Sequence, residues 1–333
     1  MEMMDRPRDP IERAVVGQID LYEVTEWDPR GGLDRIAMRT HWLVARSVRV
    51  VVTLAAVFVL IGIGGVAVLT DAQTSVLTVL SGVPAVAIAW YVYRSDVTTA
   101  EPLSLLVATV LLGMVTASFA AVINSALRPS FTLLGPLGVA SFFIIVVGPV
   151  EEAVKLLAVR LYAYSDARFD AVIDGAVYGA MAGLGFAIVE NAFYITRSLP
   201  MAEVPLGAGL IGAGGGITAV RALAGPGHVI YSAIAGYYLG LAKFNPGIRG
   251  PIIIKGLLIA AGVHALYNLS VGPATLALGA LTGGRTTGLI AYVLIFDGAL
   301  AMLLVGKLRR YEAVYRRVVL SGVRRCAARR TSR

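Results

Sequence analysis

The feature that most constrains this chain is a series of long apolar segments separated by short polar ones. The segment 50–69 is apolar on every face of a helix, and it matches the roughly 20 residues that a helix needs to cross a bilayer. With 57% hydrophobic and only 15% charged residues, the chain lacks the polar surface of a water-soluble globule. A transmembrane β-barrel is also excluded, because its strands would alternate apolar and polar residues. The sequence predicts an all-α, polytopic transmembrane helical bundle.

About eight segments are long and apolar enough to be spanning helices. A further segment, 206–217, holds six glycines in twelve residues. Glycine disfavours helix, so we expect an outer loop or a re-entrant segment there. The expected spans are roughly 49–70, 76–93, 103–124, 139–161, 172–196, 218–242, 251–271 and 287–306.

The formal net charge of +8 is concentrated at the C-terminus. From Lys307 onward there are ten Lys/Arg and one acidic residue, and the rest of the chain is nearly neutral. A basic tail beside a membrane span is typical of a cytoplasmic anchor that attracts anionic lipid headgroups, so we expect no nucleic-acid partner. The single cysteine, Cys326, lies in this tail and excludes an intramolecular disulfide.

The N-terminal 48 residues contain no continuous apolar segment, which excludes a cleavable signal peptide. We divide the chain into a cytoplasmic leader (1–48), a transmembrane bundle (49–306) with its active-site spans within 139–271, and a basic cytoplasmic tail (307–333). The end of the leader and the first residue of the next segment carry residues spaced four, three, four and three apart, which predicts an interfacial amphipathic helix. These residues are Arg35, Arg39, Trp42, Arg46 and Arg49.

Polar residues gather in the second half of the predicted bundle. A charge at the bilayer centre costs about 2.5–3.5 kcal/mol on insertion scales, so intramembrane ionisable residues are functional candidates. At 1.5 Å per residue, those on neighbouring spans come out about 10 to 20 Å from the outer helix ends, which predicts one shared site. The alternative is that each group only hydrogen-bonds a neighbouring helix. The residues are Glu151, Glu152, Lys155, Glu190, Asn191, His228, Ser232, His264 and Asn268.

Local spacing suggests how such a site is built. Pro149 removes a backbone donor, so we expect a kink beside Glu151 that admits water. Glu151 and Lys155 are four residues apart, which favours an ion pair that keeps one glutamate charged, or a purely structural pair. His264 and Asn268, also four apart, can direct two donors at one point, as stabilisation of an oxyanion requires.

Small residues are predicted to bring two of these helices close together. Glycines recur at every fourth position on the fifth span, and the sixth span aligns His228 with small residues at the same spacing. Such faces permit close helix contact and would draw Glu190 and His228 into the bundle. The stripes are Gly175, Gly179 and Gly183, and Ser232, Gly236 and Gly240.

At these residues the sequence resembles the PrsW family of intramembrane proteases, which is related to the CAAX-protease and bacteriocin-processing superfamily. Where the CAAX enzymes carry FxxxH, this chain has Phe186 and Glu190, as in the PrsW pattern. The resemblance covers roughly residues 100–305. Four segments on consecutive spans carry it: EEAVK at 151–155, FAIVEN at 186–191, GHVIYSAIAG from Gly227, and HALYN at 264–268.

The resemblance implies a glutamate-dependent peptidase. Glu151 and Glu152 would be the candidate bases, with His264 and Asn268 as oxyanion donors and Glu190 and His228 completing the catalytic set. It also implies a membrane-anchored protein substrate such as an anti-sigma factor. A divalent metal could be held by Glu151, Glu190, His228 and His264, but the chain has no HExxH motif, so a metal-free mechanism is favoured.

Two other functions are compatible with the same polar residues. A proton-coupled transporter would use glutamate, histidine and lysine in one layer as a relay, although no repeat symmetry is visible. A non-catalytic scaffold of the same fold would have little use for a complete hydrolytic set.

The charge distribution also predicts the topology. Eighteen of the 29 basic residues lie in the two ends of the chain, which by the positive-inside rule puts both termini in the cytoplasm and requires an even number of crossings. A topology reporter fused after Arg333 should therefore give a cytoplasmic signal. An extracellular signal would overturn both the number of spans and the depth assigned to the site.

Overall fold

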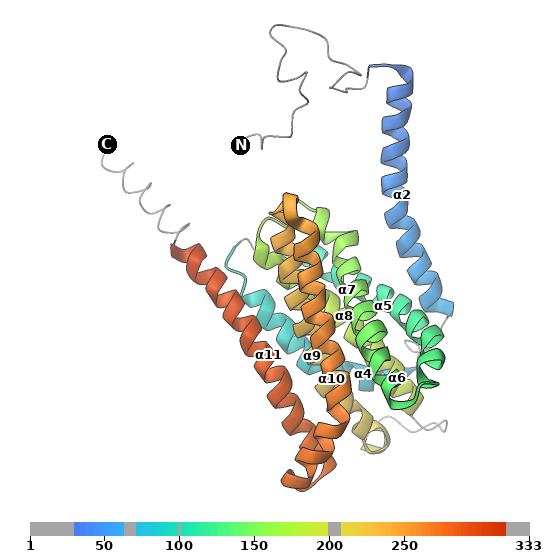
Figure 1. The fold of residues 1–333 in the computed structure, drawn as a ribbon, viewed down its shortest axis with the longest axis vertical. Helices are drawn as coiled ribbons and strands as arrows, with labels where there is room; N and C mark the ends of the chain where they lie inside the picture. The colour runs from blue at the N-terminus through green and yellow to red at the C-terminus, as the bar shows by residue number, and fades with distance from the viewer. Residues whose placement is uncertain (1–29, 63–70, 99–100, 199–207, 318–333) are drawn as a thin grey trace, which may run out of the picture. The chain divides into compact units, whose positions relative to one another are not determined.

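The computed structural model describes residues 30–62, 71–98, 101–198 and 208–317, and every regular element in these ranges is helical, which confirms the all-α class (Figure 1). The chain divides into two units, residues 1–52 and 53–333. The elements are α2 (Gly32–Gly62), α4 (Ala72–Arg94), α5 (Leu103–Thr132), α6 (Gly135–Phe142), η1 (Phe143–Val147), α7 (Gly148–Leu161), η2 (Ala163–Ser165), α8 (Val172–Ser198), α9 (Ala208–Lys243), η3 (Pro246–Ile248), α10 (Arg249–Thr282) and α11 (Arg285–Tyr315).

Five helical segments of the described chain are long and apolar enough to cross a membrane, which supports a multi-pass membrane protein. The predicted number of about eight spans is not confirmed. The expected span at 139–161 is divided among α6, η1 and α7, which have 8, 5 and 14 residues. The five segments are Ala72–Arg94, Leu103–Thr132, Val172–Ser198, Pro246–Thr282 and Arg285–Tyr315.

The two ends of the chain are described only in part. The cationic stripe of the leader falls within α2, so the predicted helix is present there, and its interfacial position stays a prediction. The basic tail begins within α11, and Cys326 lies outside the described residues.

The glycine-rich segment differs from the expectation. Residues 208–217 are helical and form the first turns of α9, so they are neither a loop nor a separate segment. Helix propensity is a weak local preference, and here the segment extends a longer helix whose later turns pack against α4, α8 and α10.

Pro149 disturbs its helix as predicted, but one turn earlier than the two glutamates. The turn at Phe143–Val147 is π-helical, and α7 restarts at Gly148 with Pro149 in its first turn. A proline has no N–H for the carbonyl four residues before it, so a wider turn at this point is the expected accommodation.

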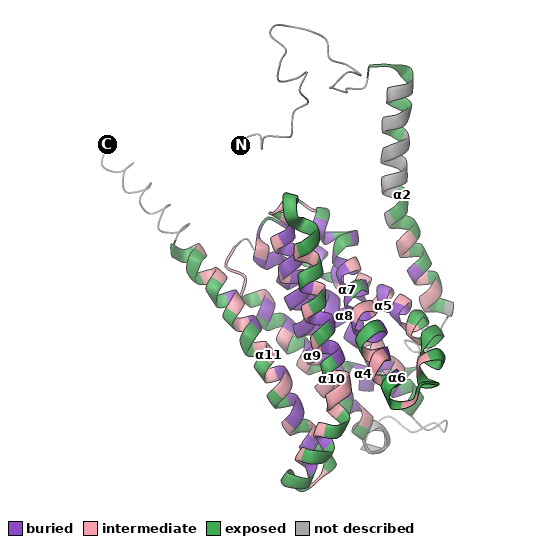
Figure 2. Cartoon of the chain, viewed as in Figure 1, coloured by how far each residue is buried: buried purple, intermediate pink, exposed green. Residues whose placement is uncertain are grey.

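Helix α8 forms the centre of the bundle. It packs against α4, α5, α7 and α9, and 83% of its most apolar window is buried, against 28–39% in the other four candidate spans. Figure 2 shows this contrast, with buried residues concentrated on α7, α8 and α9 and many exposed residues on α10 and α11. Most residues of α8 are therefore enclosed by the surrounding helices, whereas its last residues, 196–198, are exposed.

Glycines allow α8 and α9 to touch along their backbones, as the small-residue stripes predicted. A Cβ atom added at Gly179 would lie 2.2 Å from the carbonyl oxygen of Ser232, and one at Gly183 would lie 2.4 Å from that of His228. Only glycine fits at these two positions. The helices that carry Glu190 and His228 therefore lie closer together than a side chain at either glycine would allow.

This contact predicts the effect of a single methyl group. Gly179→Ala should lower the free energy of unfolding by about 1–3 kcal/mol, because the added methyl forces α8 and α9 apart. The measurement is thermal unfolding of the purified protein in detergent. Gly306→Ala is the matched control, since Gly306 is exposed within α11 with no atom within 4 Å of its added Cβ, and alanine there should be neutral or stabilising. Equal stability of the two variants would contradict the packing.

Candidate functional site

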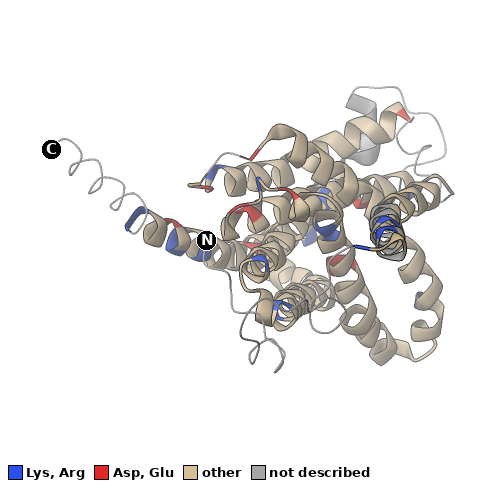
Figure 3. Ribbon diagram, turned by 90° about the horizontal axis from the view of Figure 1, so that it is seen from above, with Lys and Arg blue, Asp and Glu red and all other residues tan. Residues whose placement is uncertain are grey.

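Helices α7, α8, α9 and α10 place their polar side chains in one buried cluster, as the sequence predicted. Charged residues lie among the helices of the bundle as well as at their ends (Figure 3). Contacts link seven of the expected site residues directly, and all but Glu190 are at least 95% buried. They are Glu151, Glu152 and Lys155 on α7, Glu190 on α8, His228 and Ser232 on α9 and His264 on α10.

Glu152 is the most fully bonded member of this cluster. Its Oε1 accepts hydrogen bonds from Lys155 Nζ at 2.6 Å and from His264 Nδ1 at 2.9 Å. Its Oε2 accepts one from Ser232 Oγ at 3.3 Å. Both carboxylate oxygens of Glu152 are therefore already occupied.

The expected pair between Glu151 and Lys155 is wrong. Lys155 pairs with Glu152, three residues away, and Glu151 turns instead to α5, where Asn124 Nδ2 donates to its Oε1 at 3.0 Å. Residues three apart and residues four apart both lie on one face of a helix, so contacts with the neighbouring helices decide which glutamate pairs with Lys155. The Lys155 ammonium also lies 4.3 Å from the centre of the Phe186 ring, which adds a cation–π contact.

His228 bridges the lysine and the glutamate of α8. Its Nδ1 lies 2.9 Å from Lys155 Nζ, and its Nε2 lies 2.8 Å from Glu190 Oε2. An ammonium group has only donors, so Nδ1 accepts and Nε2 carries the proton that it donates to Glu190.

Glu190 is held in addition by a residue that sequence reasoning missed. Arg221 on α9 pairs with Glu190 Oε2 at 2.5 Å and donates through Nε to Asn191 Oδ1 at 2.9 Å. Asn191 in turn donates to Ser81 Oγ on α4 at 3.0 Å. Arg221 is a charged residue inside the expected span 218–242, and a charge inside a span is the same signal that identified the other site residues. Asn124 is a polar amide residue at the end of the expected span 103–124.

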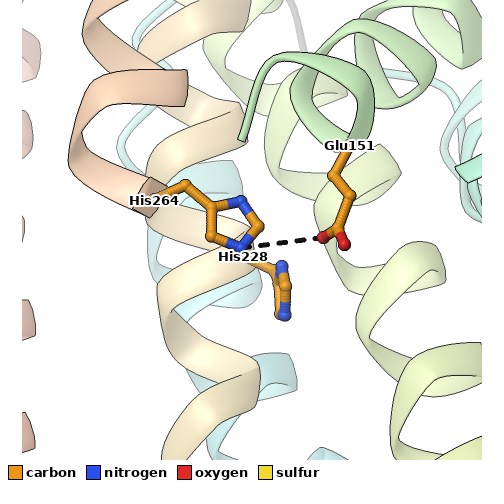
Figure 4. A group of neighbouring side chains, drawn as sticks. All are labelled: Glu151, His228 and His264. Atoms are coloured by element: carbon orange, nitrogen blue, oxygen red, sulfur yellow. Dashed lines mark ion pairs between the residues drawn. The ribbon is translucent and has the colours of Figure 1, made fainter. Parts of the chain in front are cut away.

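Glu151 keeps one carboxylate oxygen free. Its Oε2 is buried without a hydrogen-bond partner in the described structure and lies 3.6 Å from His264 Nε2 (Figure 4). In the neutral tautomer of His264 that donates from Nδ1 to Glu152, Nε2 is an acceptor that faces Oε2 of Glu151; in the imidazolium, Nε2 is a donor and the two residues form an ion pair. In the neutral form, a donor or a cation between the two atoms would satisfy both acceptors.

The same atoms fit a divalent metal. Glu151, His228 and His264 each offer a ligand atom, and these atoms lie within 4.8 Å of one another. Two ligands of a tetrahedral zinc, each about 2.1 Å from the ion, are about 3.4 Å apart, close to the Glu151–His264 separation. Glu190 is outside this group, and His228 would have to release Lys155 or Glu190 to bind the ion.

Asn268 is the expected site residue that stays outside the network. It follows His264 by one turn of α10, is partly buried, and forms no hydrogen bond to the cluster. In the neutral tautomer that donates from Nδ1 to Glu152, Nε2 of His264 is an acceptor, whereas in the imidazolium both nitrogens donate. The role of His264 and Asn268 as oxyanion donors stays a prediction.

Comparison with known proteins gives a consistent assignment. Residues 101–300 match the family described as "PrsW family intramembrane metalloprotease". Protease PrsW of Halalkalibacterium halodurans is 28% identical over 185 residues, covering 56% of this chain and 78% of that protein. Protease PrsW of Bacillus subtilis is 30% identical over 189 residues, with the same coverage. Protease PrsW of Geobacillus kaustophilus is 29% identical over 187 residues, covering 56% and 75%.

No solved structure matches the chain. The family match covers more than half of the sequence and includes the whole of α7, α8, α9 and α10, which carry the cluster. On this basis the chain belongs to the PrsW family of intramembrane proteases.

Proposed function

We propose that this protein is an endopeptidase that cleaves a membrane-anchored protein near the outer face of the membrane, with Glu151 activating the attacking water. The observation that carries the proposal is the buried, unpartnered Oε2 of Glu151 facing Nε2 of His264. A water between these atoms could donate a hydrogen bond to each. General-base catalysis requires this geometry.

Each member of the cluster then has a role. Glu151 Oε2 takes the proton as the water oxygen attacks the peptide carbonyl carbon, and later returns it to the leaving amine. Glu152 holds His264 through Nδ1 and so keeps Nε2 free to position the water. Asn268, whose amide is not engaged by the cluster, is the remaining candidate donor to the oxyanion.

Glu190 supports a site toward the outer face. It lies eight residues before the end of α8 at Ser198, or about 12 Å along the helix. With both termini in the cytoplasm and four spans before α8, as the sequence predicts, this end of α8 would face outward. Family resemblance suggests a substrate of the anti-sigma-factor type, and the basic tail suits anionic lipid headgroups.

A metal-dependent form of the same peptidase is the second candidate, favoured by the spacing of Glu151, His228 and His264. When bound, a divalent ion would polarise the peptide carbonyl and lower the pKa of a bound water. Glu152 would then orient His264 through Nδ1. Chelation separates the two forms: loss of cleavage that zinc restores favours the metal, and unchanged cleavage favours the metal-free reaction.

The two glutamates should differ in their effect on turnover. With single-span peptides as substrates, Glu151→Gln should lower kcat by about 10²- to 10⁴-fold because the general base is lost. Glu152→Gln should lower activity by about 10- to 100-fold, because the Glu152 carboxylate orients His264 and Lys155 but does not contact the water. Thermal unfolding of both variants is the control for folding.

Several results would contradict this assignment. Inactive Glu152→Gln beside active Glu151→Gln would reverse the two roles. Wild-type rates in both variants would remove the carboxylate mechanism. Failure to cleave any peptide of a diverse library, together with a glutamate-dependent proton flux in liposomes, would favour the transporter.

A further inference from the structure

A second group of buried carboxylates lies at the opposite end of α8 from Glu190. Asp96 and Glu101 come from the connection between α4 and α5, and Asp174 lies in the first turn of α8. Each offers a carboxylate oxygen, and these atoms lie within 4.8 Å of one another. Glu190 follows Asp174 by sixteen residues, or about 24 Å along the helix, so the two sites are separate.

No cationic side chain in the described residues forms an ion pair with these three carboxylates. The charge of Lys243 acts on Asp174 and Glu101 only from a distance, because its Nζ donates to the backbone carbonyls of Asp166 and Phe169 at 3.2 and 2.7 Å. No direct ion pair within the described residues therefore neutralises the group.

Uncharged hydroxyl and backbone N–H groups donate hydrogen bonds to only some oxygens of the three carboxylates. The Tyr178 hydroxyl donates to Glu101 Oε2, and the Thr98 hydroxyl donates to Asp96 Oδ1 at 2.7 Å. Two backbone N–H groups, of Asp170 and Ala171, donate to Asp174 Oδ2 at 2.8 and 2.7 Å. These hydrogen bonds orient the carboxylates, but they leave other carboxylate oxygens of the group without a donor.

Two of the remaining oxygens are buried and unpartnered. Glu101 is only 4% exposed, and its Oε1 has no hydrogen-bond partner; the same holds for Oδ2 of Asp96. A carboxylate buried in this way is costly while it stays charged without a partner. Such a group is stabilised either by a proton or by a bound cation.

We propose that Asp96, Glu101 and Asp174 form a binding site for an oxygen-preferring divalent cation, with Ca²⁺ as the best candidate. Ca²⁺ accepts oxygen ligands in a flexible geometry, whereas Mg²⁺ demands a near-ideal octahedron and usually keeps several waters in place of protein ligands. The donors are all oxygen, which disfavours zinc and copper. The cation would tie the α4–α5 connection to the start of α8, the helix that carries Glu190 at its other end.

This site does not depend on the hydrolytic activity, so it can be tested by binding alone. Titration calorimetry of the purified full-length protein with CaCl₂ should show binding, and Ca²⁺ should raise the Tm. Glu101→Gln keeps an acceptor for Tyr178 and should weaken Ca²⁺ binding at least about tenfold. Its Tm without Ca²⁺ should equal or exceed that of the wild type, because a buried charge is removed.

Three further variants separate this site from the alternatives. Asp96→Asn, in a less buried residue, should also weaken binding. Asp166→Asn removes an acidic charge nearby without touching the three carboxylates, and Glu151→Gln alters the hydrolytic cluster; both should bind Ca²⁺ as the wild type does. The proposal is overturned if neither Ca²⁺ nor Mg²⁺ binds at millimolar concentration, if Glu101→Gln binds as tightly as the wild type, or if Glu151→Gln abolishes binding.

Discussion

The ion pair between Glu152 and Lys155 organises the polar interior of this protein. Both side chains are fully buried, where a single charge without its partner would be strongly destabilising. From this pair, Lys155 reaches His228 and Glu152 reaches His264. The pair thereby sets which nitrogen of each histidine carries the proton, and it leaves Glu151 as the carboxylate with an oxygen to spare.

The pair can exist only because the helices around it approach closely. Glycines on α8 and α9 allow backbone contact, and a network of α8 and α9 side chains, Glu190 with His228 and Arg221, closes one side of the cluster. Helix α8 then carries a polar group near each end, the candidate active-site cluster at Glu190 and the three carboxylates at Asp174. Its central position shields both groups from lipid.

Much of this arrangement could be predicted from the sequence, because charged residues in apolar helices are rare and costly. The motifs on four consecutive spans identified seven residues that the structure brings together. The partner of Lys155 could not be predicted, because Glu151 and Glu152 are both within reach of Lys155 on the same helix. Glu151 instead accepts a hydrogen bond from Asn124 on α5, which leaves Glu152 to pair with Lys155. The helical state of 208–217 was missed because local glycine content says nothing about the longer helix that contains it.

The central claim is that Glu151 Oε2 and His264 Nε2 hold the reacting water, or an ion, between them. The most direct test is an experimental structure of the protein in a membrane mimetic, at a resolution that shows ordered solvent. The account predicts one density peak within about 2.0–3.2 Å of both atoms. A direct hydrogen bond between the two side chains with no peak, or either side chain turned toward lipid, would contradict it.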